Sequence, residues 1–192
     1  MLYKILKLIS IFLFKILFRL KVIGKENIPK KGGFILASNH VSYLDPVTLG
    51  VACPRRLNFM AKEELFPNKL VSWFLSSLGA FPVKRESADL SAIKEAIRRL
   101  REEEVLVLFP EGSRRFDGDK TEPYSGVGFL VSKVNVPVIP AFIRGTDKAL
   151  PKKAKFIRLK PISVHFGKQI YFEKGGSYFE ITNQIMDKIK KL

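Results

Sequence analysis

The informative segment for chemistry is Ser38-Asn39-His40-Val41-Ser42-Tyr43-Leu44-Asp45. Histidine is the natural general base near neutral pH when a carboxylate fixes its tautomer. His40 and Asp45 are five residues apart, so on a continuous helix their side chains would point about 140° away from each other. They can cooperate only if the intervening residues turn, which Asp45-Pro46 permits because the residue before proline avoids helical angles. Taken alone, this spacing favours a loop histidine with a satisfied hydrogen bond.

A second segment, Phe109-Pro110-Glu111-Gly112-Ser113-Arg114-Arg115, leaves the end of a fully apolar stretch. Gly112 allows close backbone approach, Glu111 can bind a hydroxyl or a cation, and Arg114 can grip a phosphate in bidentate fashion. A charged surface turn is the alternative. Two more cations, Lys62 and Arg85, also follow strand candidates. Three cations at three strand ends can converge on one oxyanion.

Elements that alternate between strand and helix must position these residues. Short apolar runs bounded by turn residues predict strands at 34–37, 57–61, 81–83, 105–109, 136–143 and 162–166. Helices are predicted to start at Asp45-Pro46, where Asp caps well and Pro suits the first position, and to span 66–78, 88–101, 126–134 and 177–191. The helix 88–101 has an apolar stripe of Leu90, Ile93, Ile97 and Leu100.

This alternation predicts the α/β class, with one domain over residues 23–192 that contains a mixed, largely parallel sheet flanked by helices. The strand at 105–109 is fully apolar and suits the centre of that sheet.

Residues 1–22 are predicted to form an amphipathic helix that associates with a membrane surface. Their longest uncharged run, Leu8 to Phe14, is far shorter than the roughly 20 residues that a spanning helix needs. A basic, Phe-rich helix suits the interface, where apolar atoms enter the acyl chains and cations lie near phosphates. The alternative is a terminal helix folded onto the protein's own core. The residues expected to bind the membrane are Lys4, Lys7, Phe12, Phe14, Lys15, Phe18 and Arg19.

The composition narrows the classes of partner. The chain has 192 residues, and 34 Lys and Arg against 18 Asp and Glu give a formal charge of +16. This excess predicts anionic partners: phosphates, an acidic membrane face or nucleic acid. No acid occurs from Lys148 to Lys168, and the basic stretch 152–160 within it is either a solvated face or a contact with lipid headgroups or CoA phosphates. Cys53 is the only cysteine and there are two histidines, which excludes a disulfide scaffold and argues against a metal site.

A nucleic-acid-binding module is the rival from another class, because the basic charge permits it. That reading leaves the apolar face of residues 1–20 unexplained, and no RNA- or DNA-binding signature is present. Nucleic acid is therefore not expected as a partner.

Four short motifs resemble those of the glycerolipid acyltransferase family and occur in the same order. They are NHVSYLD (39–45), GAFPVKR (79–85), FPEGSRR (109–115) and VPVIP (136–140). Family members of the bacterial 1-acylglycerol-3-phosphate acyltransferase type look most similar, also through segment 60–66. The resemblance covers about residues 20–170, and four motifs in order make it specific.

The resemblance implies an α/β fold and roles for individual residues. His40 and Asp45 correspond to the catalytic pair, and Pro137 and Pro140 correspond to the motif on the acyl-donor side. The residues implied to line the phosphate and acceptor site are Lys62, Arg85, Glu111, Gly112, Ser113 and Arg114.

The implied reaction moves a fatty acyl group from acyl-CoA or acyl-carrier protein to the sn-2 hydroxyl of 1-acylglycerol 3-phosphate (lysophosphatidic acid). The product is phosphatidic acid, a phospholipid precursor, and no cofactor is needed. The implied location is the cytoplasmic face of the cell membrane, as a peripheral, monotopic protein. Alternatives are another acceptor, such as glycerol 3-phosphate or another lysolipid, and a lipid-binding relative without catalysis.

Overall fold

The computed structural model describes residues 2–84, 89–111, 126–151, 154, 156–173 and 176–192. The helices in this part of the chain are α1 (Leu2–Leu17), α2 (Asp45–Ala52), α3 (Lys69–Ser77), α4 (Leu90–Arg101), α5 (Gly126–Lys133), α6 (Thr146–Ala149) and α7 (Tyr178–Lys190). The strands are β1 (Lys21–Ile23), β2 (Phe34–Ser38), β3 (Leu57–Lys62), β4 (Ala80–Val83), β5 (Val105–Leu108), β6 (Val138–Arg144) and β7 (Ser163–Phe166).

The strands form one sheet in the order β1-β7-β6-β2-β5-β3-β4. Neighbouring strands are parallel except β6 and β7, which are antiparallel. The five strands β6, β2, β5, β3 and β4 therefore run in the same direction, and their carboxyl ends share one edge of the sheet. The predicted α/β class with a mixed, largely parallel sheet is confirmed. The predicted central strand is also confirmed, because β5 lies between β2 and β3 and all four of its residues are buried.

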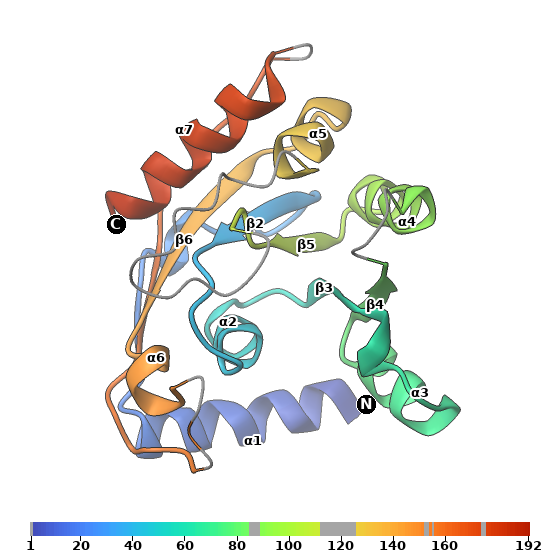
Figure 1. Ribbon diagram of the computed structural model, residues 1–192. Coiled ribbons are helices and arrows are strands. Elements are labelled where there is room, and N and C mark those ends of the chain that lie inside the picture. The colour runs from blue at the N-terminus through green and yellow to red at the C-terminus, as the bar shows by residue number, and fades with distance from the viewer. Residues whose placement is uncertain (1, 85–88, 112–125, 152–153, 155, 174–175) are drawn as a thin grey trace.

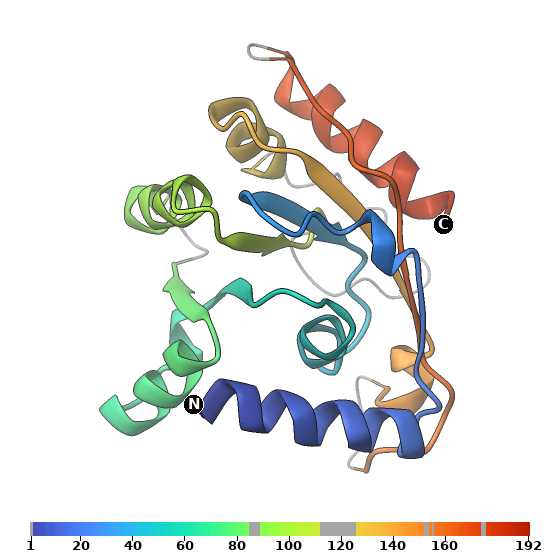
Figure 2. The ribbon, with the colours of Figure 1, turned by 180° about the vertical axis from the view of Figure 1, so that it is seen from behind.

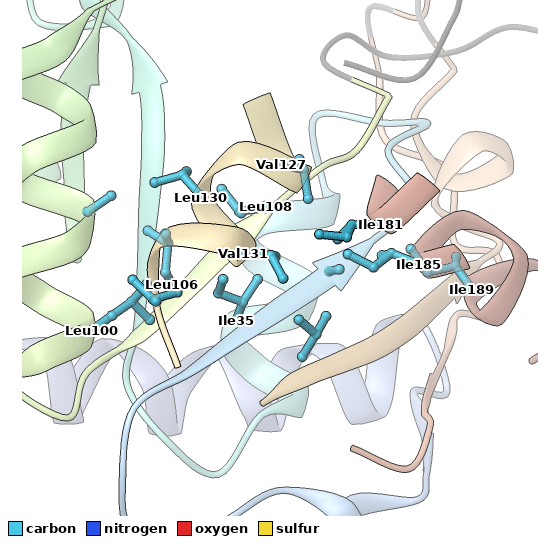
Figure 3. Close-up of a cluster of buried hydrophobic side chains, with 14 of the residues drawn as sticks. Ile35, Leu100, Leu106, Leu108, Val127, Leu130, Val131, Ile181, Ile185 and Ile189 are labelled. Carbon is cyan, nitrogen blue, oxygen red and sulfur yellow. The ribbon is translucent and has the colours of Figure 1, made fainter. Parts of the chain in front are cut away.

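Helices cover both faces of the sheet (Figures 1 and 2). Successive residues of β2 alternate between the two cores, since side chains along a strand point to opposite faces. Ile35 and Ala37 belong to a core with α4, α5 and α7, which Figure 3 shows around Leu106 and Ile185. Phe34 and Leu36 belong to a second core, which α2 covers through Leu49. The sheet is thus buried on both sides, as parallel sheets usually are.

Two helices differ from the sequence prediction in detail. Helix α3 begins at Lys69 rather than at residue 66, because the Asn68 side chain accepts the Val71 N–H at 3.0 Å and caps the helix there. On α4 the predicted stripe is partly wrong: Leu90 is 64% exposed. The fully buried positions of α4 are Ala92, Ala96 and Leu100, and Ile93 and Ile97 pack beside them. Close packing of the helix against the sheet favours the small alanines. The short elements β1 and α6 were not predicted.

Helix α1 uses one face for the protein and leaves another exposed. Phe14 and Phe18 are buried in a small cluster with Val51 of α2, Ala149 of α6 and Ile162. Leu8, Phe12 and Ile16, which are spaced four residues apart, remain exposed together with other aliphatic side chains. The helix ends at Leu17 rather than at residue 22, because the chain enters β1 at Lys21. One face packs on the core, and membrane contact by the exposed face stays a prediction. Within the part of the chain that the structure describes, no helix has the length and hydropathy that crossing a bilayer requires.

Three of the residues expected to bind the membrane face the protein instead. Phe14 and Phe18 lie in the cluster just described, because α1 needs an apolar face to hold it on α2. The Nζ atom of Lys7 donates to the Cys53 carbonyl at 2.6 Å and to the Arg55 carbonyl at 3.3 Å, at the carboxyl end of α2. Carbonyls at a helix end have no partner in the helix and favour a cation. The other four residues are exposed: Lys4, Phe12, Lys15 and Arg19.

Candidate active site

His40 and Asp45 meet across a turn at the carboxyl end of β2. The strand ends at Ser38, residues 39–44 form no helix or strand, and α2 begins at Asp45. The turn brings the Nδ1 atom of His40 to 2.8 Å from the Oδ2 atom of Asp45. The condition set by their spacing, that the intervening residues must turn, is met. An imidazole held by a carboxylate in this way presents its other nitrogen, Nε2, to a substrate.

The Asp45 carboxylate is completely buried and organises the whole turn. Its Oδ2 atom also accepts the backbone N–H groups of Val41 and Ser42, each at 2.7 Å. Helix α2 begins at Asp45, as predicted, but the prediction that the Asp45 side chain caps the helix is wrong. The side chain reaches back to the turn, and no side-chain capping bond to α2 forms. One oxygen therefore fixes both the backbone of the turn and the orientation of the imidazole.

The second motif contacts the first through Phe109 and Glu111. The rings of His40 and Phe109 are stacked, with centroids 4.1 Å apart and planes 20° apart. The His40 backbone N–H donates to Glu111 Oε2 at 3.3 Å. These contacts follow from the parallel pairing of β2 with β5, which places both segments at one edge of the sheet. The His40 side chain keeps 14% of its surface exposed.

Asn39 and Ser42 anchor the turn, and sequence reasoning gave neither of them a role. The Asn39 amide donates to the Ile143 carbonyl of β6 at 2.9 Å and accepts the Ile143 N–H at 2.7 Å. The Ser42 hydroxyl donates to the Leu150 carbonyl, just after α6, at 3.0 Å. The available signal was an asparagine two residues after the apolar run Phe34 to Ala37, where a buried amide needs partners on a neighbouring strand.

The predicted phosphate site is only partly covered by the described residues. Lys62 is exposed at the carboxyl end of β3, which pairs in parallel with β5, and so lies at the same sheet edge as His40 and Glu111. Four residues expected there lie outside the described residues: Arg85, Gly112, Ser113 and Arg114.

The two prolines of the fourth motif lie beside β2, the strand that precedes His40. Pro140 is buried in β6 and pairs in register with Ala37 of β2. The Pro137 carbonyl, just before β6, accepts the Ile35 N–H at 3.0 Å. Among the described residues, no group of three or more His, Cys, Asp or Glu side chains could hold a metal ion.

The chain is similar in sequence to several known proteins. The chain is 33% identical over 175 residues to the 1-acyl-sn-glycerol-3-phosphate acyltransferase of Bacillus subtilis, and the match covers 90% of this chain and 87% of that protein. It is 34% identical over 123 residues to the Streptococcus pneumoniae protein with the same description, covering 62% of this chain and 45% of that protein.

A solved structure has the same fold. The crystal structure of the 1-acyl-sn-glycerophosphate (LPA) acyltransferase PlsC from Thermotoga maritima superposes with a TM-score of 0.80 at 25% sequence identity. The superposition covers 98% of this chain and 77% of that one. The family model described as "Acyltransferase" matches residues 19–144, a range that includes the His40–Asp45 turn and the Phe109–Glu111 segment. On the strength of this match and of the Bacillus subtilis relative, the chain belongs to the acyltransferase family.

Proposed function

We propose that this protein is a 1-acylglycerol-3-phosphate acyltransferase that uses His40 and Asp45 as its general base pair. It takes an acyl group from an acyl thioester, acyl-CoA or acyl-carrier protein, and transfers it to the sn-2 hydroxyl of lysophosphatidic acid. The product is phosphatidic acid. The relatives in Bacillus subtilis and Streptococcus pneumoniae carry the description of this activity.

The observation that carries the mechanism is the 2.8 Å contact between His40 Nδ1 and Asp45 Oδ2. With Nδ1–H donating to the carboxylate, Nε2 is the basic nitrogen and removes the proton of the acceptor hydroxyl. The hydroxyl oxygen attacks the thioester carbonyl carbon, and a tetrahedral oxyanion forms. The imidazolium, stabilised by Asp45, returns the proton to the leaving thiolate as the C–S bond breaks. An ester and a free thiol result.

The acceptor's phosphate is proposed to bind at the sheet edge that carries His40. Lys62 at the end of β3 and Glu111 after β5 both belong to this edge. Arg85 and Arg114 follow the neighbouring strands β4 and β5 in the sequence, and cations there would complete a phosphate site. Gly112 and Ser113 are proposed to line the same site, and Pro137 and Pro140 to shape the acyl-donor side.

An anionic membrane surface is the proposed partner, at the cytoplasmic face of the cell membrane. Lysophosphatidic acid carries an acyl chain and resides in lipid. Leu8, Phe12 and Ile16 of α1 are exposed, and Lys4 and Lys15 on the same helix are exposed as well. Helices of this composition bind at the headgroup boundary.

The test compares the two histidines of the chain. His40→Ala is expected to lower turnover by roughly 10²–10⁴-fold, while its unfolding transition stays close to that of the unchanged protein. His165→Ala is the matched control, because His165 lies on β7 and its ring nitrogen contacts the Leu192 carbonyl at 3.0 Å. Transfer is measured as thiol release with lysophosphatidic acid, glycerol 3-phosphate and a lysophosphatidylcholine as acceptors. Near-normal transfer by the His40 variant would refute the mechanism. Faster thiol release with glycerol 3-phosphate than with lysophosphatidic acid would refute the proposed acceptor.

A further inference from the structure

The segment between α6 and β7 exposes an unusual set of side chains. All five residues from Phe156 to Lys160 are exposed. Phe156 is 82% exposed and Leu159 65% exposed, and Ile157 is exposed as well. Arg158 and Lys160 alternate with these apolar groups, and no acidic residue occurs between Lys148 and Lys168. Three large exposed apolar side chains next to two cations form a surface that suits a partner with both apolar and anionic groups.

Hydrogen bonds hold the backbone of this segment in place, so its side chains are exposed on an ordered part of the chain. The Arg158 N–H donates to the Ala149 carbonyl of α6 at 2.7 Å. The Ile162 N–H donates to the Phe18 carbonyl, just after α1, at 2.9 Å. Bonds on both sides of residues 159–161 fix the segment while its apolar side chains point away from the core.

The segment lies beside the carboxyl end of α1. The bond from Ile162 to Phe18 joins it to the carboxyl end of that helix. Figures 1 and 2, seen from opposite sides, both show α1 along the lower edge of the molecule with α6 and the following segment at its carboxyl end. Residues 156–160 therefore lie near the carboxyl end of α1, where Ile16 and Leu17 are exposed.

We propose that residues 156–160 are a second contact with an anionic phospholipid surface, next to α1. The proposal rests on the proposed function, since it concerns the same membrane. Apolar side chains enter the acyl boundary, and Arg158 and Lys160 pair with lipid phosphates. A CoA phosphate would use the two cations but would leave Phe156, Ile157 and Leu159 without a role.

This contact would place the active site at the membrane. The Ser42 hydroxyl of the His40–Asp45 turn donates to the Leu150 carbonyl at 3.0 Å, and Leu150 lies six residues before Phe156. Helix α1 is fastened to the same region, because Phe14 and Phe18 share a cluster with Ala149 and with Leu44 of the turn. Docking through both surfaces would hold the turn at the lipid boundary, where the acceptor resides.

The first experiment measures vesicle sedimentation of the full chain. Phe156→Ser/Leu159→Ser is expected to weaken binding to vesicles of phosphatidylglycerol and phosphatidylcholine by about tenfold or more. Leu90→Ser/Phe179→Ser is the matched control. It removes one exposed Leu from α4 and one exposed Phe from α7, which lie away from α1 in both views. The control is expected to bind like the unchanged protein. Unchanged binding of the first variant, or equal loss in both variants, would overturn the proposal.

The second experiment separates lipid phosphate from donor phosphate. Arg158→Gln/Lys160→Gln is expected to weaken binding to anionic vesicles by about fivefold per cation, with little effect on pure phosphatidylcholine. Lys188→Gln/Lys190→Gln on α7 is the control with equal loss of charge. In detergent micelles, where no vesicle surface is needed, the Arg158/Lys160 variant is expected to keep the unchanged protein's KM for acyl-CoA. A raised KM with unaltered vesicle binding would assign the cations to the donor and overturn the proposal. Absence of transfer by the unchanged protein in micelles would instead count against the proposed function.

Discussion

The Oδ2 atom of Asp45 holds the His40 ring at 2.8 Å and the N–H groups of Val41 and Ser42 at 2.7 Å each. A single buried oxygen is thus the acceptor for three donors. Structural support and the proposed chemistry both depend on this atom, and substitutions at Asp45 can separate them.

Asp45→Asn is expected to keep the fold and lose activity. The amide can orient its oxygen toward the three donors, but its NH2 group then takes the buried position of Oδ1, which has no hydrogen-bond partner among the described residues. The free energy of unfolding should therefore fall by about 1–3 kcal/mol, less than in Asp45→Ala. The negative charge that stabilises the imidazolium is lost, and turnover should fall by roughly 10²–10⁴-fold. Asp45→Ala leaves all three donors unpaired and should lose both stability and activity. Urea unfolding and thiol-release kinetics measure the two effects, and equal unfolding of both variants would contradict this assignment.

Asn39→Ala is expected to destabilise the protein by about 1–3 kcal/mol, because it leaves the buried N–H and carbonyl of Ile143 without their partner. The turn that carries His40 also loses its link to β6, so turnover should fall as well. Urea unfolding checks the stability, with Asn135→Ala as control since Asn135 is an exposed loop residue. Equal stability of the two variants would show that the Asn39–Ile143 pair contributes nothing.

Lys7→Met is expected to loosen α1 from α2. The variant keeps the apolar stem and removes the ammonium that binds the carbonyls of Cys53 and Arg55, at a cost of about 1 kcal/mol. Lys4→Met, at an exposed position on the same helix, should change stability little. Thermal unfolding compares the two, and an equal shift in both would argue against the role of Lys7 at the end of α2.

Lys7 also predicts a pH dependence at alkaline pH. Burial lowers the pKa of Lys7 below its ordinary value of 10.5, so between the lowered pKa and 10.5 the unfolded chain binds more protons than the folded one. The contribution of Lys7 to stability therefore rises with pH in that window. The difference in unfolding free energy between the unchanged protein and Lys7→Met should grow as pH approaches 10.5. A difference that shrinks would contradict the burial of the ammonium.

Glu95→Gln is expected to change how the free energy of unfolding depends on pH in acid. Hydrogen bonds from Arg98 and then Arg99 lower the pKa of Glu95 to about 2, from an ordinary value of 4.5. The stability that this carboxylate contributes is complete above pH 4.5 and disappears as pH falls toward 2. At pH 7 the substitution should cost about 1 kcal/mol or less, since the ion pairs lie on the surface of α4. Urea unfolding from pH 7 to 2 should show the two proteins converging, and a constant difference would refute the assignment.

Two glycine substitutions are expected to have opposite effects. A Cβ atom at Gly128 of α5 would lie 1.9 Å from the Tyr178 carbonyl oxygen of α7, so Gly128→Ala should force the helices apart and cost about 1–3 kcal/mol. A Cβ atom at Gly50 of α2 would meet nothing within 4 Å. Gly50→Ala should stabilise the protein by up to about 1 kcal/mol, because alanine is the better helix former. Thermal unfolding measures both, and a neutral Gly128→Ala would contradict the close approach of α5 and α7.

The sequence by itself determined the class of the fold and pointed to the residues of the candidate active site. Apolar runs of strand length, such as Val105 to Leu108, and periodic helical stretches are local signals, because burial on both faces of a parallel sheet requires uninterrupted apolar residues. The His40–Asp45 pair could be found because both residues lie in one short turn with a proline directly after it.

Only the tertiary structure decided which surfaces those elements bury and what supports the turn. The partner of Asn39 is Ile143, 104 residues away, and no local pattern encodes that contact. Lys7 and Phe14 face the protein, and Ala96 rather than Leu90 is buried on α4. A hydrophobic pattern indicates that a face can be buried, but the neighbouring elements determine whether that face is buried. Their arrangement depends on long-range packing of the whole chain, which residue types and spacing do not specify.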